Sequence, residues 1–540
     1  MRGGGIWDSG MAFLSTLRLG KLLALSGTLL FVCVLTSPPA GAVVHEQASQ
    51  AQASADPDND LAKQEEALRA AARRTPDDAQ VLARLGRVLA LQSKTEDAIP
   101  WLEKALKRHP TDSDTRKTLA TCYWQLGQLE KARRNLELVL RSKPQDSWSN
   151  LLLGMVSEDL GDHARCARLL SAMLPRVRQR PEPILSLVRA YYQLKEPNKA
   201  QETLRYLRDL PNGSKAIFSG GRTAAEFHDY PTAEELFRSI LYTYGEPGEV
   251  QFNLALTQYS EQRFDESQQT LLASIRSGHA NGNTYELLGW TYQKQDLLPE
   301  MLQAFEKAIN MDPTQPSHIL ELGQALLEKK NSETALEVAK EAIKRFPASS
   351  RAYSLKGSAE LRASRLTEAL QSYTKAVALD PKDPKAALGL ALTYWNANQT
   401  PEAMKAFTEA ASKFPNEALI QLKYAIFLIF SPEQKTSELE AQIETLLKRS
   451  EQLDGSIAET HFDLGNIAVR QNKYEDALRQ FAAAATLDPD LAKVHFALAR
   501  VYRRLGREDD AAKETELHNR LKAKEEKDSD ANAAIGTKHP

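Results

Sequence analysis

A 34-residue period runs through most of this 540-residue chain and constrains its fold more than any other feature. The apolar residues between Ala79 and Asp112 stand at offsets that recur 34 residues later, and again from Pro316 onward. Within each unit they follow three- and four-residue steps, which predict two amphipathic helices joined by a short turn. One such pair cannot bury its apolar faces alone, so the units are expected to stack around a continuous core.

One position in the first predicted helix of each unit is almost always small. Its occupants are Gly86, Ala120, Gly154, Val188, Gly221, Ala255, Gly289, Gly323, Gly357, Ala391, Ala425, Gly465 and Ala499. Glycine inside a helix costs about 1 kcal/mol relative to alanine, so its recurrence here predicts a close approach of the two helices. Prolines are expected to end many second helices, because proline lacks the N–H donor and clashes with the preceding turn.

The pattern resembles the tetratricopeptide repeat family, which places Leu-Gly, Ala, Phe, Ala and Pro at these offsets. Leu464-Gly465, Ala477, Phe481, Ala484 and Pro489 show it most clearly. The resemblance covers residues 79–525 as about 13 units. They begin near residues 79, 113, 147, 181, 214, 248, 282, 316, 350, 384, 418, 458 and 492. The resemblance implies an all-α fold, an α-α superhelix of helix-turn-helix repeats, with the first helices lining a concave face.

The remaining segments carry other expectations. Residues 1–42 combine Arg18 and Lys21, the uncharged run 22–36 and an Ala40-Gly41-Ala42 end, which predict a secretory signal peptide. The run is shorter than the roughly 20 residues of a spanning helix. We therefore expect the protein to be exported, either to the periplasm or by secretion. The alternative is that the N-terminal segment stays uncleaved and anchors the protein in the membrane. Residues 43–60 are predicted to be a disordered linker, 61–78 a capping helix and 526–540 a disordered tail.

No catalytic domain is expected. The segments outside the repeats are shorter than the roughly 50 residues of a minimal domain. Walker A, H-E-x-x-H, G-x-S-x-G and C-x-x-C motifs are all missing from the sequence. His461 and His495 recur at one offset, near His518, but that offset is a core position, so packing is favoured over metal binding. The sequence predicts no catalytic residue, cofactor or metal site.

Cys122 and Cys166 leave two alternatives open. They could form a disulfide in an oxidising compartment. Isolated cysteines at buried helix positions are more often small apolar side chains.

The resemblance also implies which first-helix offsets face the groove. The aromatic residues there are Trp124, Trp148, Tyr192, Phe218, Phe252, Tyr259, Trp290, Trp395, Phe462 and Phe496. Leu388, Leu392, Leu422, Ile426 and Ile429 continue the surface. Aromatic side chains dominate the binding energy of many interfaces, so we expect a peptide or protein segment to bind here. The alternative is that several of these side chains only pack against neighbouring repeats.

These observations favour an exported, non-enzymatic scaffold for protein–protein contacts. A chaperone for unfolded chains is the alternative, and a sugar- or RNA-binding solenoid is less favoured. The chain has 69 Lys plus Arg and 71 Asp plus Glu, a net charge of −2, which argues against a nucleic-acid partner. Lys493, Arg500, Arg503 and Arg504 form a small basic cluster at the last groove. A solvated cap or a site for an acidic partner or polysaccharide would both account for it.

Overall fold

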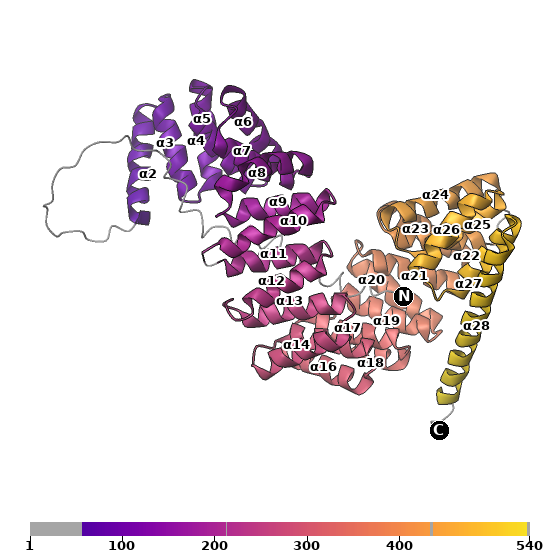
Figure 1. The fold of residues 1–540 in the computed structure, drawn as a ribbon. Helices are drawn as coiled ribbons and strands as arrows, with labels where there is room; N and C mark the ends of the chain where they lie inside the picture. Colours follow the sequence, from indigo (N-terminus) through magenta and orange to yellow (C-terminus); the bar gives the residue numbers. More distant parts are fainter. Residues whose placement is uncertain (1–56, 212, 432–435, 537–540) are drawn as a thin grey trace. The chain divides into compact units, whose positions relative to one another are not determined.

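The computed structural model describes residues 57–211, 213–431 and 436–536, which form helices joined by short turns and contain no strand (Figure 1). The all-α solenoid class expected from the sequence is confirmed. The predicted signal peptide, most of the predicted linker and residues 537–540 lie outside the described residues.

Contacts divide the chain into two compact units, Met1–His279 and Ala280–Pro540. The first unit contains α2 (Pro57–Arg74), α3 (Ala79–Leu91), α4 (Thr95–Arg108), α5 (Ser113–Gln125), α6 (Leu129–Ser142), α7 (Ser147–Asp159), α8 (His163–Val177), α9 (Pro181–Gln193), α10 (Pro197–Leu204), the 3-10 helix η2 (Arg205–Asp209), α11 (Ser214–Glu226), α12 (Tyr230–Ile240), α13 (Pro247–Ser260) and α14 (Phe264–Arg276). From α3 onward these helices form successive antiparallel pairs, and α2 packs on α3.

The second unit repeats the arrangement. It contains α15 (Gly282–Lys294), α16 (Leu298–Met311), α17 (Pro316–Glu328), α18 (Ser332–Arg345), α19 (Ser350–Arg362), α20 (Leu366–Leu379), α21 (Pro384–Asn396), α22 (Thr400–Lys413), α23 (Ala418–Phe430), α24 (Ser437–Leu453), α25 (Ala458–Arg470), α26 (Tyr474–Leu487), α27 (Ala492–Arg504) and α28 (Glu508–Gly536). The odd-numbered helices from α3 onward are the first helices of the pairs. Their first residues match the predicted starts except at Pro247, one residue early.

Both ends of the described chain differ from the sequence-based boundaries. The helix expected over residues 61–78 is α2, which begins earlier, at Pro57, and ends at Arg74. Residues 526–540 were expected to be disordered, whereas α28 continues to Gly536. Residues 526–536 include Glu526, Lys527 and three alanines, and residues of high helix propensity readily extend an existing helix.

The turn inside twelve of the helix pairs has one repeated geometry. At the end of α3, Ser93 adopts a left-handed conformation with φ of 60°, and the Lys94 N–H donates to the Leu89 carbonyl over 2.9 Å. This hydrogen bond closes the helix end. The equivalent left-handed residues are Gly127, Gly161, Lys195, His228, Gln262, Asp296, Lys330, Ser364, Asn398, Asn472 and Gly506. Most are not glycine, so the closed turn offsets a conformational cost of roughly 1–2 kcal/mol each.

The small first-helix position is where the two helices of a pair meet. A Cβ atom on Gly86 would lie 2.5 Å from Leu102 Cγ, and one on Gly465 would lie 2.5 Å from Phe481 Cε1. In both pairs the large residue follows the glycine by 16 positions. The close approach predicted from the sequence is therefore a repeated contact between a small residue and a large one.

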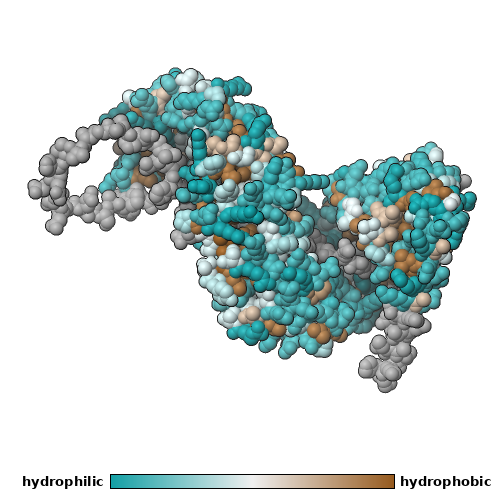
Figure 2. Space-filling model, in the orientation of Figure 1, coloured by the Kyte–Doolittle hydropathy of each residue, from teal (hydrophilic) through white to brown (hydrophobic). Residues whose placement is uncertain are grey.

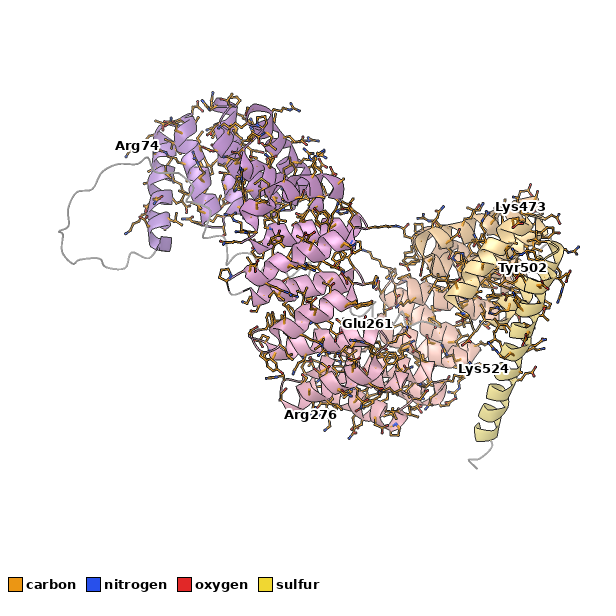
Figure 3. All side chains as sticks on the ribbon, in the orientation of Figure 1. Arg74, Glu261, Arg276, Lys473, Tyr502 and Lys524 are labelled. Carbon is orange, nitrogen blue, oxygen red and sulfur yellow. The ribbon has the colours of Figure 1, made fainter. Side chains whose placement is uncertain are left out.

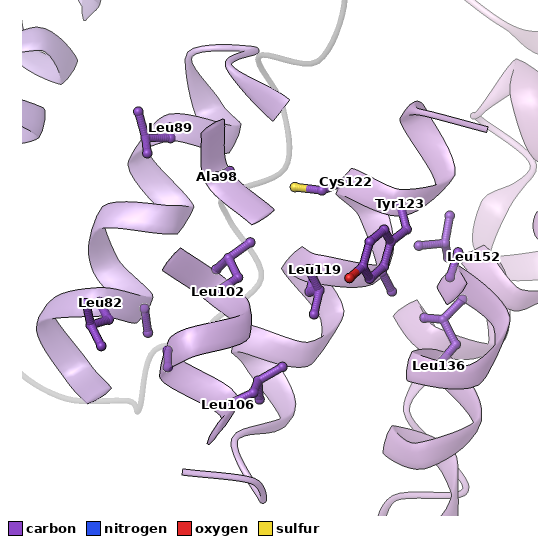
Figure 4. Close-up of a cluster of buried hydrophobic side chains, with 14 of the residues drawn as sticks. Leu82, Leu89, Ala98, Leu102, Leu106, Leu119, Cys122, Tyr123, Leu136 and Leu152 are labelled. Atoms are coloured by element: carbon purple, nitrogen blue, oxygen red, sulfur yellow. The ribbon is translucent and has the colours of Figure 1, made fainter. Parts of the chain in front are cut away.

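These contacts merge into cores shared by neighbouring pairs. One core joins buried residues of α3 to α7, among them Leu82, Leu102, Leu119, Tyr123 and Leu152 (Figure 4). Such sharing makes each pair depend on its neighbours.

Within each unit the first helices form the inner layer. Successive first helices touch one another, as in α3–α5, α7–α9, α15–α17 and α19–α21. Successive second helices in the described chain make no contact of similar extent. Elements that lie closer together occupy the inside of a curved stack, so the first helices line the concave side of each unit.

The region from Pro144 to Asn281 departs from the strict repeat pattern. Two of its second helices are shortened: α10 has 8 residues and continues as the five-residue η2, and α12 has 11 residues.

Alanine at Gly389 is expected to destabilise the second unit by about 1–3 kcal/mol, despite the better helix propensity of alanine. A Cβ atom there would overlap the ring of Tyr373, and the ring cannot retreat because a Cβ on Gly357 would already lie 2.8 Å from its other side. Tyr373 is also tethered, with its hydroxyl 2.7 Å from Ser358 Oγ. Thermal unfolding monitored by circular dichroism measures the loss.

Gly455→Ala is the matched control, because its nearest neighbour would be the Glu451 carbonyl at 3.5 Å. Equal stability changes in the two variants would contradict the packing argument.

Candidate partner-binding surface

Three of the ten predicted groove aromatics are buried. The side chains of Tyr192 and Phe218 are 8% exposed and that of Trp290 is 3% exposed. Phe218 stacks on Tyr244 with ring centroids 4.7 Å apart, and Trp290 meets Phe305 edge-on at 5.8 Å. These rings stabilise the repeats and leave little surface for a partner.

Tyr192 also borders an open pocket of 460 Å³ in the first unit. Its ring stacks on Phe227 at 5.1 Å, and its hydroxyl donates to Asp229 Oδ2 over 2.7 Å. Burial, together with this hydrogen bond to a carboxylate, raises the pKa of the Tyr192 phenol. The Gln201 side chain donates to the same oxygen over 2.9 Å. Asp229 thus uses this oxygen to bind side chains from α9 and α10.

Six predicted aromatics are half-buried and one is exposed. Trp124, Trp148, Phe252, Tyr259, Trp395 and Phe462 form the half-buried group. Trp124 Nε1 donates to Asp159 Oδ2 over 2.7 Å, across neighbouring first helices. Burial raises the pKa of Asp159, and this hydrogen bond opposes the rise. Phe496 is 48% exposed.

An apolar row lies on the inner layer of the second unit. Leu388, Leu392 and Trp395 are half-buried and share one face of α21, because they are four and three residues apart. Trp395 is held edge-on to Phe427 at 5.6 Å, and half-buried Ile429 follows on α23. We name Leu388, Leu392, Trp395 and Ile429 the apolar row.

Two residues expected to extend this surface do not. Leu422 is fully buried and Ile426 is 8% exposed. The reason is that α23 is apolar on nearly all sides and packs into the core it shares with α24 and α25. The view in Figure 2 also shows apolar patches within the mostly hydrophilic surface of this unit.

Charged side chains of the inner layer pair between successive first helices. Arg189 on α9 binds Glu158 on α7 through two hydrogen bonds of 2.9 Å. Lys423 on α23 approaches Glu459 on α25 to 2.6 Å. Glu321–Arg351 is a further pair of this kind, and His318 Nδ1 lies 2.6 Å from Glu286 Oε2. These contacts were not predicted, although polar or charged side chains of opposite character about one repeat apart are the sequence signal for them.

Asp463 on α25 is the most perturbed carboxyl group of this layer. Burial, together with the nearby charge of Glu459, raises its pKa to about 6. Lys493, Asn466 and Lys423 favour the ionised form and limit the rise. The folded protein therefore binds more protons at this site than the unfolded chain does between about pH 4 and pH 6.

The raised pKa predicts a pH-dependent gain in stability for Asp463→Asn. Stability of the parent protein falls as the pH rises through this window, because the folded state resists ionisation. The variant cannot ionise, so it should gain up to about 3 kcal/mol at pH 7.5 and little at pH 4. Unfolding midpoints at the two pH values measure the difference. Asp490→Asn, at an exposed carboxylate, is the control. A gain of equal size at both pH values would refute the assignment.

The histidines have structural partners. His461 Nε2 lies 2.9 Å from the Gly455 carbonyl, and His495 Nε2 lies 2.9 Å from the Pro489 carbonyl. Their Nδ1 atoms meet Gln480 and Glu514 respectively. His518 bonds to a separate carbonyl, that of Ala492. In the described part of the chain, no three His, Cys, Asp or Glu side chains gather as a metal site would require.

Cys122 and Cys166 are buried free thiols. Burial raises the pKa of Cys122 to about 11 and that of Cys166 to about 12, which disfavours the reactive thiolate. Within residues 57–211, 213–431 and 436–536, no helix combines the length and apolar character that a membrane crossing needs.

Comparison with known families gives a consistent result. Models described as tetratricopeptide repeat match residues 59–113, 89–153, 282–315, 320–384, 360–426 and 462–517, together more than half of the chain. The chain belongs to the tetratricopeptide repeat family. Proteins of this family generally bind protein partners and are generally not enzymes, which supports a protein-interaction scaffold.

Individual relatives are distant. BBSome complex member BBS4 of Bos taurus is 24% identical over 360 residues, 66% of this chain and 62% of that protein. Superkiller protein 3 of Schizosaccharomyces pombe is 24% identical over 235 residues, 41% of this chain and 17% of that protein. The chain thus spans less than two thirds of the length of either relative. The crystal structure of yeast Tom70 matches with a TM-score of 0.39 and 16% identity, covering 82% of this chain and 92% of that one.

Proposed function

We propose that this protein is an exported scaffold that holds a peptide or protein segment against the apolar row of its second unit. The observation that carries the proposal is the position of that row. It lies on the inner layer, where Leu388, Leu392 and Trp395 keep part of their apolar surface in water. Clustered apolar surface on a soluble chain favours a binding role.

The opposite faces of α21 explain why this surface is available. Ala386, Gly389 and Thr393 are small and fully packed inside the repeat core. That face makes the main contact of α21 with the repeat core. Leu388, Leu392 and Trp395 pack against the core only in part and keep the rest of their apolar surface exposed. A partner that covers the inner face removes this remaining apolar surface from water.

The chemistry of the row indicates the kind of segment that fits. Three apolar side chains at helical spacing suit a partner with apolar anchors three or four residues apart, or an extended segment with alternate apolar residues. Trp395 is the anchor of this surface, because its ring is positioned by Phe427 and large aromatic side chains contribute most to such interfaces.

A variant of the apolar row tests the proposal. Leu388→Gln with Leu392→Gln keeps side-chain size while removing apolar surface, and it should abolish crosslinks between α21 and a partner in cells. The control is Leu138→Gln with Leu302→Gln, because these leucines are 42% and 37% exposed on second helices. Crosslinking mass spectrometry identifies the neighbours of both variants, with circular dichroism confirming that they fold.

Unchanged neighbours in the apolar-row variant would exclude this surface as the binding site. Loss of one stoichiometric neighbour would support a scaffold. Equal capture of many unrelated unfolded polypeptides would instead support the chaperone alternative.

Export is a separate part of the proposal and rests on the pattern of residues 1–42. We expect the mature protein to begin at Val43. N-terminal sequencing of protein purified from its native cells measures this, and an intact N-terminus would contradict cleavage.

A further inference from the structure

The last first helix of the array has an exposed face unlike the others. Lys493, Phe496, Arg500 and Arg504 follow one another on α27 at steps of three, four and four residues, so they share one face. All four side chains are exposed, including Phe496 at 48%. Tyr502 and Lys524, labelled in Figure 3, mark α27 and α28 at this end of the unit. We name these four residues the α27 stripe.

The cations of the α27 stripe lack the pairing seen elsewhere in the inner layer. Lys423 and Arg189 pair with carboxylates on a neighbouring first helix. Within the described residues, neither Lys493, Arg500 nor Arg504 forms an ion pair. Within the described residues, no further first helix packs on α27 to supply a carboxylate.

Two of these cations instead lie against aromatic rings. Lys493 Nζ is 4.5 Å from the ring centroid of Phe462, and the Arg500 guanidinium is 5.8 Å from that of Phe496. Cation–π contacts of this kind hold the charged groups beside the apolar surface. The stripe therefore presents an exposed ring bordered by positive charge.

This chemistry favours an acidic protein segment over a polyanion. A nucleic acid or anionic polysaccharide needs an extended basic track to release its counterions. The track here is short, because Asp463 on the neighbouring first helix α25 lies near Lys493, and Glu459 lies near Asp463. An acidic peptide with an apolar side chain satisfies both parts of the stripe, the charges and the exposed ring.

We propose that the α27 stripe binds an acidic peptide segment of a partner protein, with an apolar side chain of that segment resting on Phe496. Carboxylates of the segment pair with Lys493, Arg500 and Arg504 and take the place of a following repeat. The inference rests on the proposed scaffold function and names the chemistry of a partner at the end of the same inner layer.

Fluorescence anisotropy of labelled peptides with the full chain tests the inference. The probe is a 12-residue peptide of Asp and Glu residues around a central Leu. One companion replaces the acids with Asn and Gln, and the other replaces Leu with Ser. We expect the neutral peptide to bind at least about tenfold more weakly and the Ser peptide about threefold more weakly.

Variants of the stripe complete the test. Lys493→Glu, Arg500→Glu and Arg504→Glu together should weaken binding of the acidic Leu peptide at least about tenfold, and Phe496→Ala about threefold. The control Lys344→Glu, Lys375→Glu and Lys405→Glu changes the net charge equally, at exposed positions on the second helices α18, α20 and α22. It should leave binding within about twofold.

Three results would overturn the inference: equal weakening by the control triple, tighter binding of a 12-base-pair DNA duplex than of the peptide, or self-association of the chain that the stripe triple abolishes. The Leu388→Gln and Leu392→Gln variant separates the two proposals. If it loses its cellular partner while the stripe variants bind the peptide normally, the apolar-row proposal stands and this one fails.

Discussion

The contact between a small first-helix residue and a large second-helix residue 16 positions later sets the geometry on which the rest of the structure depends. At Gly86–Leu102 and Gly465–Phe481 the backbone of one helix approaches the side chain of the other too closely for a Cβ atom. The contact fixes how the helices of a pair cross. Repetition of the same crossing gives successive pairs the same relative orientation, and this brings the first helices together on the inside of each unit.

That inner layer has two kinds of side chain because the crossing contact occupies only one face of each first helix. The other face is not constrained by this contact and carries charged and apolar side chains. In part it carries charges, and these pair from one first helix to the next, as in Arg189–Glu158 and Lys423–Glu459. Elsewhere it carries the apolar row, which packs only in part against the neighbouring core and leaves apolar surface exposed. Function is therefore expected where the inner face departs from mutual pairing.

Much of the fold could be predicted from the sequence, because the crossing contact and the turn each require a residue type at a fixed spacing. Exposure on the inner face could not. Tyr192, Phe218 and Trp290 occupy the offsets expected to face a groove, yet each is covered by a residue such as Phe227, Tyr244 or Phe305. Whether such a neighbour is present varies from repeat to repeat. Leu422 is buried for a similar reason, since α23 is apolar on almost every side. Periodicity identifies the offset but not the local neighbours that cover it.

The same reasoning connects Asp463 with the end of the array. An inner-layer carboxyl group is stabilised in its ionised form by cations on the neighbouring first helices, and Asp463 has Lys423 on one side and Lys493 on the other. Burial nevertheless outweighs both cations and raises its pKa. Lys493 is thus only partly compensated, and Arg500 and Arg504 beyond it lie against no further first helix in the described array. Pairing in the inner layer proceeds from one first helix to the next, and within the described array no first helix beyond α27 pairs with its cations, so positive charge remains exposed on α27.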